Sequence, residues 1–197
     1  GYSPEDILFR HTIYTLCEET KHTLIKQIPD DVTIIFGMPG MINQARYNQA
    51  IVAQKGKVLA TYNKRKLPND TVFDEERYFT PGDTPCIVTL NNIKVGVIVC
   101  EDTWHEEPIT STAQAGAELI ISINASPYDR FKVNARSDML QEQAKLTQLP
   151  IIYVNLVGGQ DELVFDGGSM VVDATGQKVQ QARYYQEELM RIEANIG

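Results

Sequence analysis

A run of apolar residues at 94–99, KVGVIV, constrains the fold of this chain more than any other segment. Such a run predicts a strand that is buried on both faces, as in the middle of a sheet covered by helices. Two further apolar strands are predicted at 119–123 and 151–157, with helical patterns between successive strands. Alternating buried strands and helices are typical of a layered α/β domain. We therefore expect the α/β fold class.

The segments around this alternation predict further helices and two hairpins. Apolar residues recur at helical spacing from 4 to 28, which predicts one amphipathic helix. Turns at 54–57 and at Asn91-Asn92 predict hairpins with arms at 47–53 and 58–62, and at 87–90 and 93–99. The other predicted elements are a strand at 32–37, a helix at 108–115 closed by Gly116, a helix whose inner face carries Val133, Leu140, Ala144 and Thr147, and strands at 169–173, 177–181 and 188–192.

Composition limits the classes of partner. The chain has 197 residues, of which 43% are hydrophobic, enough for one globular domain with its own core. Its 26 carboxylates outnumber its 18 Lys and Arg residues, which gives a net charge of -8. A nucleic acid backbone or an anionic membrane would be repelled overall, so we expect neither as a partner. The apolar runs are shorter than the roughly 20 residues that span a bilayer.

Cysteine and histidine usage bears on the compartment and on metal binding. Three Cys residues, an odd number at unrelated spacings, argue for a reducing compartment, and we expect the cytoplasm. Three separated His residues lack metal-ligand spacing, so no zinc site is expected. Since the chain opens on Gly1 and shows no signal peptide, we interpret it as part of a longer protein.

Cys100 is the first candidate for chemistry. It follows the buried strand at 94–99, where α/β sheets place their ligand crevices. Amides at the start of a following helix would lower the pKa of the thiol and could hold an oxyanion. Two readings stay open, an inert buried cysteine and a nucleophile. His105, Lys64 or a carboxylate could activate it, although the polar residues that flank His105 favour a solvated histidine.

Lys64 is the second candidate. It lies in the basic segment NKRKLP at 63–68, which by itself is typical of a solvated turn. The stretch FDEERYFTPG at 73–82 follows in the same predicted loop. Because loops with many functional side chains often line sites, this density favours a role for Lys64 in a site.

Several segments carry a resemblance to a known family. The strings YNKRKLPN at 62–69, FDEERYFTPGD at 73–83 and VCEDTW at 99–104 resemble the carbon-nitrogen hydrolase (nitrilase) superfamily, in the same order along the chain. The strings NASPY at 124–128 and VGGQDELVFDG at 157–167 are similar to the glutaminase domains of glutamine-dependent NAD synthetases. The resemblance extends from residue 1 to about residue 178.

The resemblance implies a fold and a mechanism. The family has a four-layer α-β-β-α sandwich and a Glu, Lys and Cys triad. By this resemblance Cys100 attacks the side-chain amide of L-glutamine and releases ammonia, and water then hydrolyses the thioester. Lys64 stabilises the thiolate and the tetrahedral oxyanion, and Glu75 buttresses Lys64 and orients the amide.

The resemblance also implies contacts with glutamine. The residues concerned are Tyr2, Asp70, Glu101, Trp104, Ser126 and Lys132. Ser126 and Lys132 match positions that bind the glutamine head group, and Tyr2 and Trp104 match aromatic residues of the pocket. The backbone amide of Glu101 is expected at the oxyanion. Asp70 stands where the family often has Tyr, so a contact there would fall to the backbone.

The resemblance further implies that residues 1–197 are one glutaminase domain, incomplete at its N-terminus. The family's general-base Glu and its first strand, first helix and second strand would precede Gly1. No pyrophosphate or Walker-type loop occurs, so an ATP-dependent synthetase domain that uses ATP and magnesium lies outside this sequence. No cofactor is expected for the glutaminase domain itself. Its expected partners are L-glutamine, the synthetase domain of the same polypeptide, and further copies in a homo-oligomer.

Two other functions remain open. One is a free-standing nitrilase-type amidase that acts on another small amide. The other is a catalytically inactive assembly domain, which the missing general base makes plausible. In the leading hypothesis the released ammonia amidates adenylated nicotinic acid adenine dinucleotide to NAD.

Overall fold

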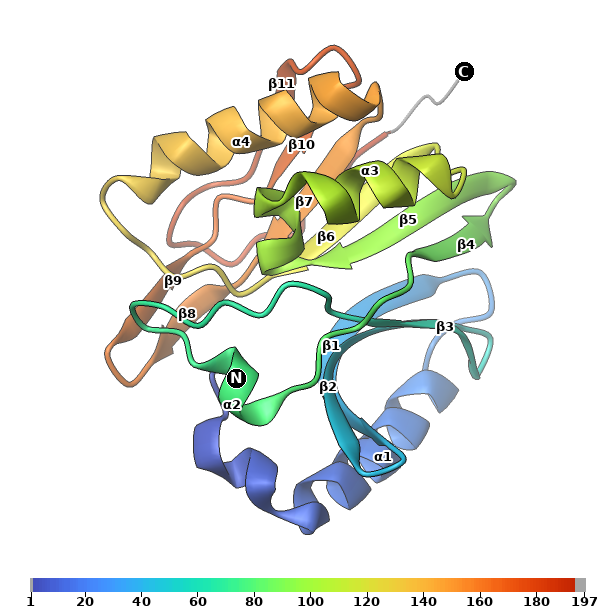
Figure 1. Ribbon diagram of the computed structural model, residues 1–197. Helices are drawn as coiled ribbons and strands as arrows, with labels where there is room; N and C mark the ends of the chain where they lie inside the picture. Colours follow the sequence, from blue (N-terminus) through green and yellow to red (C-terminus); the bar gives the residue numbers. More distant parts are fainter. Residues whose placement is uncertain (1, 194–197) are drawn as a thin grey trace. The chain divides into compact units, whose positions relative to one another are not determined.

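The computed structural model describes residues 2–193, except the side chain of Val133 (Figure 1). The described chain divides into two compact units, Ser3–Cys86 and a second that contains Tyr2 and residues 87–193. Each unit packs helices against its own sheet, which confirms the expected α/β class. No helix among the described residues is long and apolar enough to cross a bilayer.

The first unit is built on a three-stranded antiparallel sheet. Its strands β1 (Thr33–Ile42), β2 (Ala45–Gln54) and β3 (Lys57–Asn63) pair in the order β1-β2-β3. The predicted hairpin of β2 and β3 is confirmed, and Lys55 and Gly56 have the positive φ that its tight turn requires. Helix α1 (His11–Lys26) leads into this sheet, and Ile25 packs in one apolar cluster with Ile51 of β2.

The prediction of one helix from 4 to 28 is wrong. A 3₁₀ helix, η1 (Glu5–Phe9), comes first, and the extended backbone of Arg10 separates it from α1. The bend lets Tyr14 turn back on η1, where its hydroxyl donates to the Leu8 carbonyl at 2.9 Å. Tyr14 therefore takes a core position on α1, whereas Leu16 is 57% exposed.

A mixed six-stranded sheet forms the core of the second unit. Its order is β11-β10-β7-β6-β5-β4. The strands are β4 (Cys86–Leu90), β5 (Ile93–Val99), β6 (Leu119–Asn124), β7 (Ile151–Asn155), β10 (Met170–Val172) and β11 (Lys178–Gln181). The neighbours β5, β6 and β7 are parallel, and β10 is antiparallel to β7 and to β11.

Two helices connect the parallel strands. Helix α3 (Glu106–Gln114) lies between β5 and β6, and α4 (Lys132–Thr147) lies between β6 and β7, both on the same side of the sheet (Figure 1). Gly96 allows α3 to approach closely, since a Cβ there would lie 2.3 Å from the Thr112 methyl group. Leu140 and Ala144 are fully buried, which confirms them on the inner face of α4.

The last part of the chain departs from the predicted strands. The strand expected at 151–157 ends at Asn155, and Val157–Gln160 (β8) instead pairs with Leu163–Asp166 (β9) in a separate hairpin. No strand forms at 188–192, where Leu189 is 99% exposed. A short apolar alternation predicts a strand only if a sheet edge is free to pair with it.

The register of the parallel strands places their carboxyl ends together. Val99 is opposite Ile123, and Asn124 is opposite Asn155. Cys100 and Ser126, which follow β5 and β6, therefore lie at the sheet edge where α/β domains place their sites.

Candidate active site

Cys100 sits at a strained turn between β5 and the 3₁₀ helix η2 (Cys100–Trp104). Its φ is 47°, in the left-handed region that residues other than Gly and Asn seldom adopt. The buried Asp102 carboxylate accepts a hydrogen bond from the Val99 N–H at 3.1 Å, and the Thr103 hydroxyl donates to the Cys100 carbonyl at 2.7 Å. The turn is thus fixed by its own polar side chains, and such fixed strain is common at functional residues.

His105 follows this turn in the sequence, and its ring contacts the Glu101 carboxylate. Its Nε2 is 3.3 Å from Oε1 of Glu101, and the side chain is exposed. This contact agrees with the interpretation of His105 as a solvated histidine. An exposed histidine paired with a carboxylate gives no support to a Cys-His dyad.

Lys64 is a buried cation in the first unit. Only 2% of its surface is exposed, so the alternative of a solvated turn is wrong for this residue. Its Nζ lies 2.8 Å from Oε1 of Glu75, which is also buried. The backbone of Lys64 is held on both sides, since its N–H donates to the Asn48 carbonyl and its carbonyl accepts from the Gly82 N–H.

Glu75 opens the four-residue helix α2 (Glu75–Tyr78) within the loop that the sequence singled out. Its backbone N–H donates to the Pro68 carbonyl at 3.1 Å, which ties the helix back to the segment after Lys64. Arg65, the residue after Lys64, is also buried, which the sequence analysis did not predict. Its Nε donates to the Tyr62 hydroxyl at 3.1 Å. The basic segment is therefore part of the interior of this unit.

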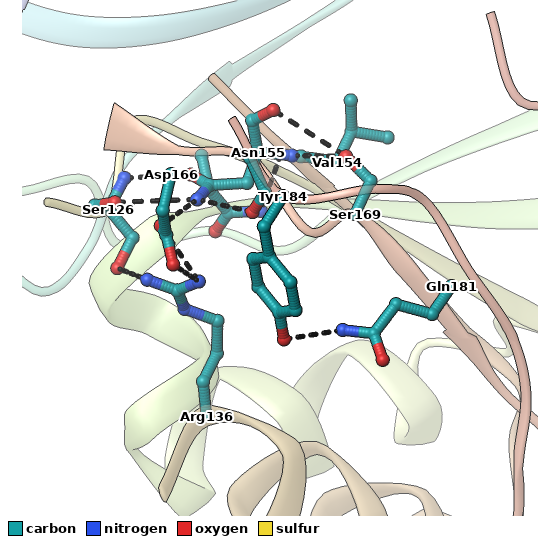
Figure 2. A network of polar contacts seen from close by, with 10 residues as sticks. Ser126, Arg136, Val154, Asn155, Asp166, Ser169, Gln181 and Tyr184 are labelled. Carbon is teal, nitrogen blue, oxygen red and sulfur yellow. Dashed lines mark hydrogen bonds and ion pairs between the residues drawn. The ribbon is translucent and has the colours of Figure 1, made fainter. Parts of the chain in front are cut away.

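Ser126 is held by a polar network in the second unit (Figure 2). Its backbone N–H donates to Oδ1 of Asn155 at 2.9 Å, and its carbonyl accepts from Nδ2 of the same side chain at 3.4 Å. Its hydroxyl oxygen accepts from Nη2 of Arg136 at 3.2 Å. Ser126 is buried, so these contacts determine how its hydroxyl is placed.

Arg136 and Asp166 form the buried ion pair of this network. Nη1 of Arg136 lies 3.2 and 3.3 Å from the two carboxylate oxygens, and both side chains are fully buried. The guanidinium also lies 6.0 Å from the ring of Tyr153, a buried residue whose phenol pKa is raised by desolvation. Asn155 joins the pair from the other side, donating to Oδ1 of Asp166 at 3.4 Å and to the Gly167 carbonyl at 2.9 Å.

Sequence reasoning missed Arg136, Asn155 and Asp166 as site residues, although one signal was present. Arg136 stands three residues after Val133 and four before Leu140. A charged residue on the inner stripe of an amphipathic helix requires a buried partner. The partner, Asp166, lies 30 residues away and only the fold brings it there.

The other predicted residues are distributed over the two units. Asp70 lies in the first unit, between Lys64 and Glu75 in the sequence, and its side chain is exposed. Four of the predicted residues, Tyr2, Glu101, Trp104 and Lys132, are half-buried and belong to the second unit. Glu101 and Trp104 belong to η2 with Cys100, and Lys132 begins α4. Among the described residues, no group of three or more His, Cys, Asp or Glu side chains could hold a metal ion.

Two curated proteins similar in sequence to this chain carry the same name. Glutamine-dependent NAD(+) synthetase of Xanthomonas campestris is 44% identical over 89% of this chain and 32% of its own length. The enzyme of the same name from Aquifex aeolicus is 39% identical over all of this chain and 35% of its own length. The chain thus spans about a third of the length of the curated relatives it matches.

Two kinds of solved structure are similar to this chain, an NAD+ synthetase and an amidase. The glutamine-dependent NAD+ synthetase of Acinetobacter baumannii, solved with ADP, is 36% identical with a TM-score of 0.91 over 95% of this chain and 36% of that one. An amidase from Nesterenkonia sp. AN1, described with a covalent adduct at its active-site cysteine, is 26% identical with a TM-score of 0.82 over 93% of this chain and 70% of that one.

The carbon-nitrogen hydrolase family model matches residues 29–195. This match covers most of the chain, and the solved relatives share its mixed α/β architecture. The chain therefore belongs to the carbon-nitrogen hydrolase family and has the fold of the nitrilase superfamily.

Proposed function

We propose that this chain is the glutaminase domain of a glutamine-dependent NAD synthetase and that Cys100 is its nucleophile. The observation that carries the proposal is the strained turn of Cys100 at the carboxyl end of a buried strand, in a member of a carbon-nitrogen hydrolase family. The names of the relatives support glutamine as the amide. Residues 1–197 are assigned to this one domain.

The proposed reaction proceeds through a thioester. Cys100 gives up its thiol proton and its sulfur forms a bond to the amide carbon of L-glutamine; the carbon–nitrogen bond then breaks as the amide nitrogen takes up that proton and leaves as ammonia. Water then hydrolyses the thioester to glutamate and restores the thiol. Lys64 supplies positive charge for the thiolate and the oxyanion, and the Glu101 amide donates to the oxyanion. The Lys64–Glu75 contact of 2.8 Å supports the role of Glu75 as the group that orients this lysine.

The remaining residues are proposed to bind glutamine. Ser126 and Lys132 recognise its head group, and Tyr2 and Trp104 form apolar walls. The buried, doubly anchored backbone of Ser126 supports its role, because a fixed polar group recognises a ligand at low entropic cost. The exposed Asp70 is assigned a backbone contact only.

The wider role follows from the relatives, which are about three times as long as this chain. We assign to the remainder of the polypeptide an ATP- and magnesium-dependent synthetase domain that uses the ammonia to form NAD. The glutaminase domain itself needs no cofactor in this proposal. A homo-oligomer and a cytoplasmic location complete it, and the three free thiols are consistent with a reducing compartment.

Substitution of Cys100 tests the proposal in the full-length protein. Cys100→Ala is expected to abolish NAD synthesis from glutamine and to leave synthesis from ammonia intact. Cys17→Ala is the matched control and should support both. Unchanged use of glutamine by Cys100→Ala would refute the assignment of the nucleophile.

Covalent labelling tests the same cysteine independently. A glutamine-derived diazo-ketone followed by peptide mass mapping is expected to modify Cys100. Cys17 and Cys86 should remain unmodified because burial raises the pKa of both thiols and so lowers their thiolate fraction. Hydrolysis of unrelated small amides without preference for glutamine would instead favour a free-standing amidase.

A further inference from the structure

We propose that Arg136 and Asp166 are positioning residues that fix the Ser126 hydroxyl as a hydrogen-bond donor to an oxygen acceptor of the substrate. The inference rests on the proposed function, since it takes glutamine as the substrate. It assigns a role to a buried ion pair that the thioester mechanism leaves unused. Glutamine offers suitable acceptors in its carboxylate and amide oxygens.

The first step of the argument is the direction of the bond between Arg136 and Ser126. A guanidinium has only donors, so at 3.2 Å the Ser126 oxygen must be the acceptor. The hydroxyl hydrogen of Ser126 is therefore directed away from Arg136. Arg136 occupies one acceptor site of the Ser126 oxygen, so the single donor of this hydroxyl is left for a group on another side. The phenol of the buried Tyr153, which makes a side-chain hydrogen bond with Ser126, is the acceptor inside the protein with which a substrate oxygen competes for this donor.

The second step is the way in which Asp166 fixes the guanidinium. Both carboxylate oxygens lie within 3.3 Å of Nη1, which leaves Nη2 directed at Ser126. The planar fork of arginine serves two partners in a fixed geometry, whereas a lysine would present a single nitrogen. The charge of Arg136 is compensated inside the protein, so the group can be buried without solvent.

The third step is the rigidity of the Ser126 backbone. Asn155 holds both the N–H and the carbonyl of Ser126 and also donates to Asp166. Asn155 is itself anchored, since its N–H donates to the Ser169 hydroxyl at 2.9 Å. Backbone and side chain of Ser126 are thus tied to one network, which extends from α4 to the segment after β9 (Figure 2).

A double-mutant cycle in the full-length protein tests this inference. The variants are Ser126→Ala, Arg136→Lys and the pair of both, and the measurement is glutamate formation from glutamine at steady state. Each single change is expected to raise KM for glutamine about tenfold and to leave kcat within about twofold, because one hydrogen bond to the substrate is lost. The double variant should have the KM of Ser126→Ala alone, since Arg136 acts through Ser126.

Ser122→Ala is the matched control. Ser122 is a buried serine on β6 whose hydroxyl donates to Asn124 rather than to the Arg136 network. It should leave KM for glutamine unchanged. If Arg136→Lys does not fold, Asp166→Asn replaces it in the same cycle, because it removes the ionic anchor and keeps the shape of the side chain.

The outcomes separate the two levels of the proposal. Non-additive KM effects with unchanged NAD synthesis from ammonia support the positioning role. Additive effects, or an equal fall of kcat for all variants that tracks a lower melting temperature, would show a merely structural pair and overturn it. Absence of glutamine hydrolysis by the wild-type protein would instead overturn the proposed function on which the inference rests.

Discussion

Lys64 and Glu75 place opposite charges 2.8 Å apart in the interior of the first unit. Burying a charge is costly, and loss of the partner charge from a buried pair lowers stability more than the pair itself contributes. The pair therefore ties the stability of this unit to the residues of its proposed chemistry. Its two members come from separate segments, one directly after β3 and one at the start of α2.

Glu75→Gln measures this dependence. The change keeps the shape of the side chain and removes the charge, so we expect the free energy of unfolding to fall by about 3 kcal/mol. Urea denaturation of the full-length protein provides the measurement. Glu76→Gln, the same change at the next and exposed residue of α2, should alter stability by no more than about 0.5 kcal/mol. Equal effects of the two changes would contradict the importance of the buried pair.

Lys64 and His105 are competing candidates for the activation of Cys100. We expect Lys64→Ala to lower the rate of glutamine hydrolysis by about 100-fold or more, because a fixed positive charge for the oxyanion is removed. His105→Ala should retain most of the activity, since its ring is exposed and faces Glu101. The assay is glutamate formation, with circular dichroism to confirm folding. The reverse order of effects would favour a Cys-His dyad.

At the scale of elements, the sequence predicted the hairpin turns, whose conformation depends on a few neighbouring residues. The turns at Lys55-Gly56 and Asn91-Asn92 have the positive φ of tight hairpin turns, and their Gly and Asn residues allowed both turns to be predicted from the sequence. The helix from 4 to 28 could not be predicted correctly, because its break at Arg10 depends on Tyr14 folding back on Leu8. Tertiary packing here overrides a continuous helical period.

Some residues of the candidate site could be predicted from the sequence and others could not. Cys100, Lys64 and Glu75 stood in strings that a resemblance identifies, and the sequence therefore named them. The ion pair of Arg136 with Asp166 joins residues 30 positions apart, and no periodicity relates them. Residues that support a site through long-range contacts become visible only when the strands and helices have been placed.

The loop at Gly82 packs closely against Asn63, the last residue of β3. A Cβ at this position would lie 2.2 Å from the Asn63 carbonyl oxygen, and the backbone there cannot rotate away as a side chain could. We expect Gly82→Ala to destabilise the protein by about 1 to 3 kcal/mol through overpacking and to reduce glutamine hydrolysis by displacing Lys64. Urea denaturation and the glutamate assay measure the two effects.

Gly159→Ala is the control for this change. A Cβ at Gly159 would make only an ordinary contact of 3.4 Å with Leu163, and its φ is not in the left-handed range. The substitution should be neutral or slightly stabilising, because Ala has less freedom than Gly in the unfolded chain. A Gly82→Ala protein as stable and active as Gly159→Ala would show that the close approach to Asn63 relaxes without cost.

At the scale of the whole molecule, the net charge of -8 distinguishes the proposed substrate from other ligand classes. Glutamine is a zwitterion without net charge near pH 7, so the overall field of the chain neither attracts nor repels it. We expect KM for glutamine to change by less than about twofold between 50 and 500 mM NaCl, a range in which the screening length falls to a few ångströms. Initial rates of glutamate formation at each salt concentration provide the measurement, with a neutral osmolyte as the control for water activity. A KM that falls severalfold as salt is added would mean that the field of the protein repels its substrate, and would favour an anionic amide over glutamine.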